Sequence, residues 1–332
     1  MTLKPGGYFF VGSVMQYDKP ALTIAEQVAR LKQRGLVFTD DARVAHYLTH
    51  IGYYRLSAYW LPFELPAPAG APRSHAFQPG TTFEQVLSLY IFDRQLRLLV
   101  MEAMERIETA IRTHWAHALA KRYGPHAHMA SGLFKSPWQH ASDIARMASD
   151  LQDSSETFIA HYRRQYTQPY LPPIWAVVET LSLGALSRWF KATKSTEAKN
   201  EVAKSLGMPT VEVLEQVLHA LTPVRNVCAH HGRLWNRRFT LQLPRIKRLK
   251  GLMVMQADDP AQPARQLYNY VLLMSQMMLR INPGSSWRQR LKQHIQNIDC
   301  DKQRAMGFPD GWAQLEVWRS QSDDGSDERS EA

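Results

Sequence analysis

The segment from Phe83 to about Arg122 constrains the fold of this chain most strongly, because its residues are typical of a helix from one end to the other. Tyr123-Gly124-Pro125 ends the segment, since glycine and proline interrupt helices. At this length we expect a kink or a break inside it. Together with several shorter helical segments, it predicts an all-α fold.

Shorter helices are expected on both sides of this segment. Thr23 and Glu26 form a capping box for the first of them, and Gly35 ends it. Gly184 marks a close contact between helices, and Trp175 is expected in the core at the start of a buried helix. The expected helices cover residues 24–34, 41–52, 142–166, 175–190, 197–206, 211–230, 265–280 and 287–298.

The composition along the chain divides it into four parts. Residues 1–80 form an N-terminal helical region that ends in a linker rich in proline and alanine, and residues 81–300 form the helical core. Residues 301–319 are a C-terminal segment that contains tryptophan. Residues 320–332 are acidic and poor in apolar residues, which predicts a disordered tail.

Charge and cysteine content limit the partners and the compartment. The 332 residues carry a formal net charge of +10, which favours a polyanionic partner. Two cysteines cannot build a disulfide framework, so a reducing compartment is expected. The apolar run Tyr8–Val11 is too short to span a membrane and lacks the order of a signal peptide. We therefore expect a cytoplasmic protein with no membrane partner.

The most informative motif lies at the end of the expected helix 211–230. It combines Arg225, Asn226 and His230, just before Gly232, which is expected to stop the helix. Asn226 and His230 are one turn apart and share a face, whereas Arg225 and His230 are about 140° apart on a regular helix. Both groups can therefore meet one substrate only through a long arginine side chain or a distorted last turn. Pro223 is expected to kink the helix just before the motif.

The three side chains could bind a phosphate and transfer a proton without a metal. His230 lies near a helix C-terminus, where the helix dipole favours imidazolium and hence a proton donor. A cationic helix end on a basic surface could equally be structural. Cations interleaved with an indole follow the motif and suit phosphates and a stacked base, although a solvated basic surface with one core tryptophan fits as well. The expected RNA-binding residues are Arg233, Trp235, Asn236, Arg237 and Arg238.

A zinc site is a weaker alternative at the same place. Cys228, His230 and His231 crowd together, with His219 upstream, but adjacent histidines point apart on a helix. Structural zinc needs four converging ligands, and no second pair appears in the sequence. We therefore expect neither a metal nor another cofactor, and we interpret Cys228 as a small buried residue.

A second cluster of charged residues lies in the long helical segment. Glu108 and Arg112 are one turn apart, so they form either an ordinary helix ion pair or a brace for the active face. Arg112 and His117 repeat the spacing of Arg225 and His230, but no asparagine follows Arg112. A second half-site at His117 stays an alternative.

The chain resembles the Abi (abortive infection) proteins of the AbiD/AbiF type, within the HEPN superfamily. Four stretches carry most of the resemblance, which extends over roughly residues 19–318. They are Gly52-Tyr53-Tyr54-Arg55-Leu56-Ser57, Leu89-Tyr90-Ile91-Phe92-Asp93-Arg94, Glu105-Arg106-Ile107-Glu108 and Leu221-Thr222-Pro223-Val224-Arg225-Asn226-Val227-Cys228-Ala229-His230-His231-Gly232-Arg233-Leu234-Trp235-Asn236-Arg237.

The resemblance implies a HEPN-like helical bundle with an additional N-terminal helical region. It also implies metal-independent RNA cleavage, with the family motif matching Arg225, Asn226 and His230. Glu108 and Arg112 match a supporting pair, and His231 is expected to support the motif too. Because HEPN nucleases pair two motifs across a dimer, the resemblance implies a homodimer.

The sequence thus predicts an endoribonuclease of a phage-defence or toxin-antitoxin-like system. Its expected partner is RNA, as substrate and possible regulator, and DNA is not expected to be cut. The alternative is a non-catalytic module that holds a structured RNA or a partner protein.

Overall fold

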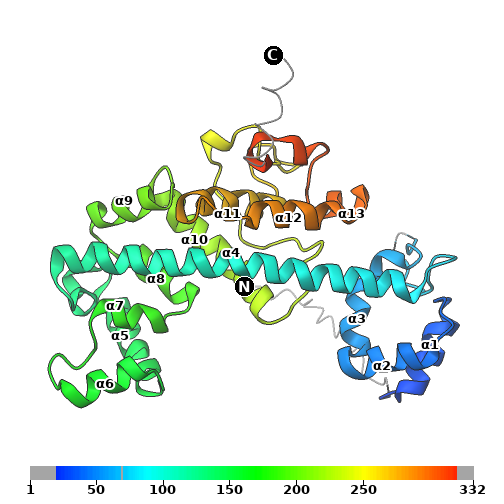
Figure 1. Ribbon diagram of the computed structural model, residues 1–332, viewed down its shortest axis with the longest axis horizontal. Helices are drawn as coiled ribbons and strands as arrows, with labels where there is room; N and C mark the ends of the chain where they lie inside the picture. The colour runs from blue at the N-terminus through cyan, green and yellow to red at the C-terminus, as the bar shows by residue number, and fades with distance from the viewer. Residues whose placement is uncertain (1–19, 69, 320–332) are drawn as a thin grey trace, which may run out of the picture. The chain divides into compact units, whose positions relative to one another are not determined.

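The computed structural model describes residues 20–68 and 70–319 (Figure 1). The expectations for the apolar run at residues 8–11 and for the acidic tail 320–332 lie outside these residues. Of the described residues, 64% are helical, in 13 α-helices with no strand, so the all-α prediction is confirmed. None of the helices in this part of the chain is long and apolar enough to cross a bilayer.

The chain divides into two compact units, Met1–Tyr90 and Ile91–Ala332. The described part of the first unit contains three short helices and the start of a fourth. The capping box of Thr23 and Glu26 and the turn at Gly35 are present as predicted. The core of this unit contains Leu31, Val44, Leu48, Leu56 and Trp60. Its helices are α1 (Ile24–Gln33), α2 (Asp41–Ile51), α3 (Tyr53–Trp60) and the 3-10 helix η1 (Leu61–Phe63).

The longest helix, α4 (Phe83–Tyr123), begins in the first unit and continues into the second. It is one unbroken helix of 41 residues, so the expected break is wrong. Apolar side chains of α4 are buried along most of its length, so packing against other helices stabilises it. They include Leu96, Val100, Met104, Ile107, Ile111, Trp115 and Leu119.

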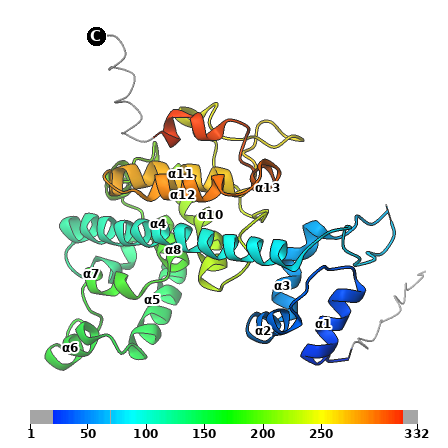
Figure 2. The same ribbon diagram turned by 45° about the vertical axis from the view of Figure 1, so that its right-hand side comes forward.

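The second unit packs helices around its part of α4, with α11 and α12 on one side and α7 and α8 on the other (Figures 1 and 2). The indole of Trp287 donates to the carbonyl of Leu99 at 2.6 Å, and that of Trp115 donates to Thr193 at 3.1 Å. The α-helices are α5 (Pro137–Gln152), α6 (Thr157–Gln165), α7 (Ile174–Val177), α8 (Leu183–Ala192), α9 (Thr196–Ser205), α10 (Val211–Ala229), α11 (Leu267–Ile281), α12 (Trp287–Gln296) and α13 (Cys300–Ala305). The 3-10 helices are η2 (Ala127–Met129), η3 (Ser131–Leu133), η4 (Val178–Thr180), η5 (Lys247–Leu249), η6 (Trp312–Gln314) and η7 (Glu316–Trp318).

Two of the expected helices are divided in the structure. The expected helix 142–166 is split into α5 and α6, and 175–190 is split into α7, η4 and α8. α8 is a separate helix because the Ser182 hydroxyl caps its start by accepting a hydrogen bond from the amide of Ala185. Trp175 is 55% exposed, so its expected place in the core is wrong.

The expected close contact at Gly184 is confirmed. It joins α8 to α10, because a Cβ atom on Gly184 would lie 3.3 Å from the Thr222 methyl group. α8 thereby holds the middle of α10 closely, and the position of the motif that follows Thr222 is fixed by this packing.

Candidate active site

The motif residues lie at the C-terminal end of α10. Thr210 caps the start of this helix, and its apolar face, which includes Leu214, Leu221 and Val224, is fully buried. The helix continues through Pro223 to Ala229. Asn226 and His230 are exposed, so the solvent face of the last turn carries the polar part of the motif.

The regular part of α10 ends at Ala229, and the next two residues leave the helical conformation. His230 is the C-cap, and His231 adopts a left-handed conformation with φ of 56°. The amide of His231 donates to Cys228 O at 3.1 Å, and that of Gly232 donates to Val227 O at 2.8 Å. This is a Schellman motif, in which glycine usually takes the position that His231 holds here. The left-handed residue that ends the helix is therefore His231, one position before the expected Gly232.

Glu108 of α4 lies between the two arginines of the site. Its Oε1 is 2.6 Å from Arg112 Nη2, and its Oε2 is 3.5 Å from Arg225 Nε. Glu108 is only 6% exposed, so this shared carboxylate sits in a poorly solvated place. The contact to Arg225 is electrostatic, because its geometry does not make a hydrogen bond. The structure thus brings Glu108, Arg112 and Arg225 together.

Arg112 is also held from the opposite side. Its Nη2 donates to the carbonyl of Leu181 at 2.8 Å, and its Nη1 is 3.9 Å from a carboxylate oxygen of Glu179. α4, the segment before α8 and the end of α10 therefore meet at one charged cluster. This cluster places the carboxylate of Glu108 next to the side chain of Arg225.

Cys228 is buried on the apolar side of α10. Burial, followed by the charge of Asp93, raises the pKa of its thiol to about 12. A thiol of this kind stays protonated at neutral pH, whereas a zinc ligand or a nucleophile must be a thiolate. Within the described residues, no group of three or more histidine, cysteine, aspartate or glutamate side chains could hold a metal ion.

Asp93 holds the loop that follows the motif, a role that the sequence reasoning did not assign. It is fully buried, and its Oδ1 accepts the backbone amides of Leu234 at 3.1 Å and of Trp235 at 2.5 Å. Arg97 pairs with the same carboxylate from one turn along α4. The available signal was a charged pair at helical spacing within an otherwise apolar face of α4.

The expected RNA-binding residues occupy different environments. Trp235 is 2% exposed and belongs to the core, which favours packing over base stacking. Asn236 and Arg238 are exposed, and the Arg237 Nε donates to the Arg233 carbonyl at 2.8 Å. The basic loop therefore presents cations and an amide, without an accessible indole.

His117 lies on α4, five residues after Arg112 of the charged cluster. It lines a cavity with Trp175, Val178 and Glu179. No exposed asparagine accompanies it there, so this cavity does not repeat the arrangement of Asn226 and His230.

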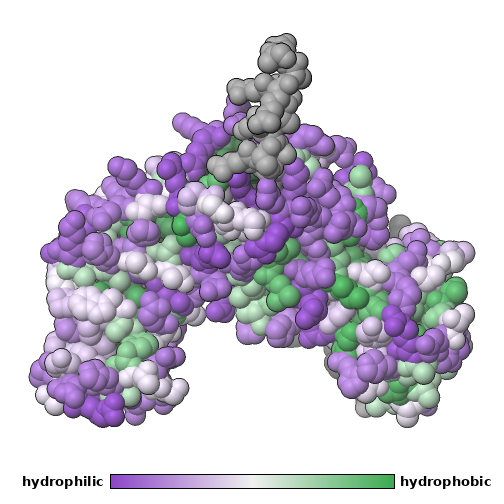
Figure 3. All heavy atoms as spheres, in the orientation of Figure 1, coloured by the Kyte–Doolittle hydropathy of each residue, from purple (hydrophilic) through white to green (hydrophobic). Residues whose placement is uncertain are grey.

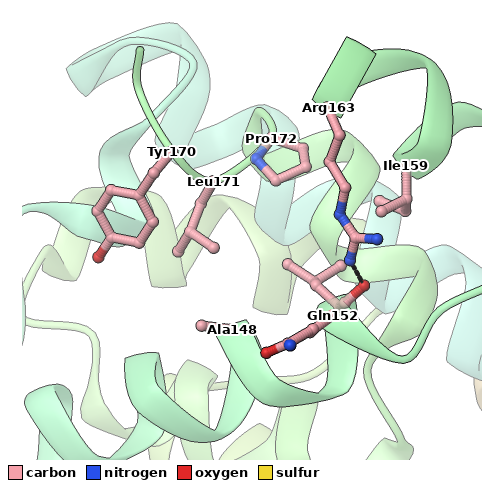
Figure 4. Close-up of a pocket in the computed structure, with 8 residues that line it drawn as sticks. Ala148, Gln152, Ile159, Arg163, Tyr170, Leu171 and Pro172 are labelled. Atoms are coloured by element: carbon pink, nitrogen blue, oxygen red, sulfur yellow. Dashed lines mark hydrogen bonds between the residues drawn. The ribbon is translucent and has the colours of Figure 1, made fainter. Parts of the chain in front are cut away.

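A separate hollow lies between α5, α6 and the loop 170–172 (Figure 4). Arg163 lies at one side and donates to the carbonyl of Leu151, while Tyr170 lies across the hollow from it. Among the residues that line this hollow, Arg163 is the one charged side chain, and part of its guanidinium is bonded to the backbone.

The fold and the site define an all-α protein with a basic, histidine-containing face at the end of one helix. A family model described as Abi-like protein matches residues 46–236, more than half of the chain. The chain therefore belongs to the Abi-like protein family, and this membership supports a part in abortive infection. No curated protein and no solved structure matches the chain.

Proposed function

We propose that this chain is a HEPN-type endoribonuclease of the AbiD/AbiF kind, acting in the cytoplasm in phage defence or as a restrained toxin. One observation carries the proposal. The carboxylate of Glu108 lies 3.5 Å from Arg225 Nε, while Asn226 and His230 are exposed at the same helix end. A cation held by a carboxylate at the same helix end as an exposed histidine suits the charge and proton changes of phosphoryl transfer.

The reaction uses the nucleophile that RNA itself carries. A base takes the proton of the ribose 2′-OH, the 2′-oxygen attacks the adjacent phosphorus, and an acid protonates the leaving 5′-oxygen. Arg225 stabilises the added negative charge on the phosphorane, and His230 is the acid or the base. Asn226 orients His230 or a phosphate oxygen. The products end in a 2′,3′-cyclic phosphate and a 5′-hydroxyl.

The supporting residues hold the catalytic residues in place. Glu108 and Arg112 hold Arg225, and His231 ends α10 so that His230 leaves the regular helix. Arg233, Asn236, Arg237 and Arg238 contact the RNA backbone. Because one histidine cannot act on both sides of phosphorus at once, two chains bring two His230 side chains to one cleft.

Purified protein incubated with end-labelled single-stranded RNA in EDTA tests this proposal. The expected products carry 2′,3′-cyclic phosphate ends, and DNA of the same sequence stays intact because it lacks the 2′-OH. RNA that is bound but never cut would support the alternative of a non-catalytic module. Cleavage that requires a divalent ion would contradict the mechanism.

A further inference from the structure

The second unit contains a cavity of about 420 Å³ in which every charged lining residue is basic. It lies where α9 turns into α10, beside η5 and the end of α11. Lys204, Arg248 and Arg280 supply the charge, and no carboxylate lines it. Over α9 the surface in Figure 3 is mainly hydrophilic. All three cations are exposed, so the cavity opens to solvent and its charge is accessible to a ligand.

Both arginines lie against one glycine, and one of them is bonded to it. Arg248 donates from Nη2 to the carbonyl of Gly207, and the Cγ atom of Arg280 lies 2.9 Å from where a Cβ on Gly207 would be. Gly207 has φ of 68°, a conformation that glycine adopts without strain. The turn between α9 and α10 therefore holds the Arg248 guanidinium by a hydrogen bond and lies against the side chain of Arg280.

The positive charge of this cavity is not compensated by neighbouring acids. None of its three cations forms an ion pair within the described residues. Glu201 of α9 pairs with Arg122 at 2.7 Å, and Glu215 of α10 pairs with Lys199. Partial burial lowers the pKa of Arg248, and the nearby charge of Arg280 lowers it further.

We propose that this cavity is a binding site for a phosphate group. Two guanidinium groups can each bind phosphate oxygens in pairs, and Lys204 adds a third charge. Thr210, the N-cap of α10, also lines the cavity, so the positive end of the helix dipole adds to these cations. The phosphate belongs either to a nucleic acid strand or to a free nucleotide.

This site is separate from the motif at the other end of α10. The 19 residues of α10 place its two ends about 28 Å apart at a rise of about 1.5 Å per residue. The inference therefore goes beyond the proposed cleavage and does not depend on it.

Two binding experiments distinguish the sources of the phosphate. In the first, a fluorescent 2′-O-methyl oligoribonucleotide, which cannot be cleaved, is titrated at several salt concentrations. In the second, the melting temperature is followed with inorganic pyrophosphate and with a nucleoside triphosphate. Each uses the full chain as wild type and as the double variant Arg248→Gln, Arg280→Gln. The matched control is Arg146→Gln, Arg164→Gln, which removes two exposed arginines of α5 and α6.

A strand ligand predicts that the double variant flattens the slope of log Kd against log salt by about 1.4, since each lost contact to a single strand contributes about 0.7. A free nucleotide predicts that triphosphate raises the melting temperature of wild type and control but not of the double variant. Arg280→Gln alone, which breaks no hydrogen bond within the described residues, gives part of either effect, and Arg280→Lys restores it. The proposal is overturned if the double variant and the control behave alike in both experiments.

Discussion

Glu108 shows how much of this site depends on one buried carboxylate. It faces Arg112 at 2.6 Å and Arg225 at 3.5 Å, so its charge offsets two cations in a poorly solvated place. Removing one partner from a buried ionic cluster leaves the others uncompensated, which costs more than the loss of a surface pair. Glu179, which also contacts Arg112, provides a natural comparison because its side chain is 47% exposed.

We therefore expect Glu108→Ala to lower the free energy of unfolding by about 3 kcal/mol, and Glu179→Ala by less than about 1 kcal/mol. Urea denaturation of the two variants measures both values. Equal losses would mean that Glu108 is not the centre of the cluster.

His128 offers a second prediction at the scale of a single residue. It is fully buried in η2, and neither of its ring nitrogens has a hydrogen-bond partner within the described residues. Burial, followed by the charges of His126 and His140, lowers its pKa to about 4. In the unfolded chain this imidazole takes up a proton near pH 6.5, so the folded state loses stability as the pH falls from there towards 4.

This single group should reduce the unfolding free energy by about 1.4 kcal/mol for each pH unit between about 6.5 and 4. His128→Met fills a similar volume without an ionisable group, so it should remove that part of the pH dependence and leave stability at pH 7.5 unchanged or higher. Denaturation curves at several pH values provide the measurement. An unchanged acid profile in the variant would show that other groups cause the loss.

At the scale of elements, the end of α10 is shaped by a residue in an unfavourable conformation. His231 has φ of 56°, and a side chain in this left-handed region costs about 1 kcal/mol that glycine avoids. Because His231 takes part in a further interaction, the useful comparison is between two variants that both lack the imidazole. His231→Gly should be more stable than His231→Ala by about 1 kcal/mol in thermal or urea unfolding. If alanine proves as stable as glycine there, the last turn does not end in the conformation described.

The boundaries set by local chemistry were predictable from the sequence. Thr23, Glu26 and Gly35 bound α1 as expected, because capping depends on residues within one turn. The break before α8 was missed, because the apolar pattern from Trp175 onward continues across the Ser182 cap. Propensity alone could not show that α4 continues unbroken, since its length is supported by packing from distant helices.

The candidate residues of the site could be chosen from the sequence, but their arrangement in space could not. Arg225, Asn226 and His230 could be chosen from spacing and resemblance, whereas the contact between Glu108 and Arg225 joins two distant helices. The role of Asp93, which holds Leu234 and Trp235, has the same origin in tertiary packing. Contacts between residues far apart in the chain cannot be predicted from the spacing of residues in a single sequence.

For the whole molecule, the open question is how many chains make one site. An apolar stripe at helical spacing on α11 either packs in the core or forms an interface between chains. The structure places this stripe inside the chain, because its side chains are at most 2% exposed. An interface between chains must therefore use another surface. The stripe consists of Leu267, Val271, Met274 and Met278.

The proposed homodimer predicts complementation between inactive variants. His230→Ala and Arg225→Ala chains should each be inactive, and mixing them should restore part of the activity if the two chains supply different groups to one cleft. Light scattering at micromolar concentration should give the mass of two chains. A mass of one chain, with full activity at that concentration, would refute the dimer.

The central claim is that His230 transfers a proton during RNA cleavage without a metal. The most direct measurement is the rate of cleavage of single-stranded RNA in EDTA by wild type, His230→Ala and His219→Ala. His219 is a matched control, because it is another exposed histidine of α10 outside the motif. We expect His230→Ala to lower the rate by about 10²–10⁴. His219→Ala should cleave as wild type does, and both variants should keep the wild-type melting temperature. Equal rates for wild type and His230→Ala would contradict this claim. A further variant, His117→Ala, would also contradict it if it lost cleavage while His230→Ala kept it.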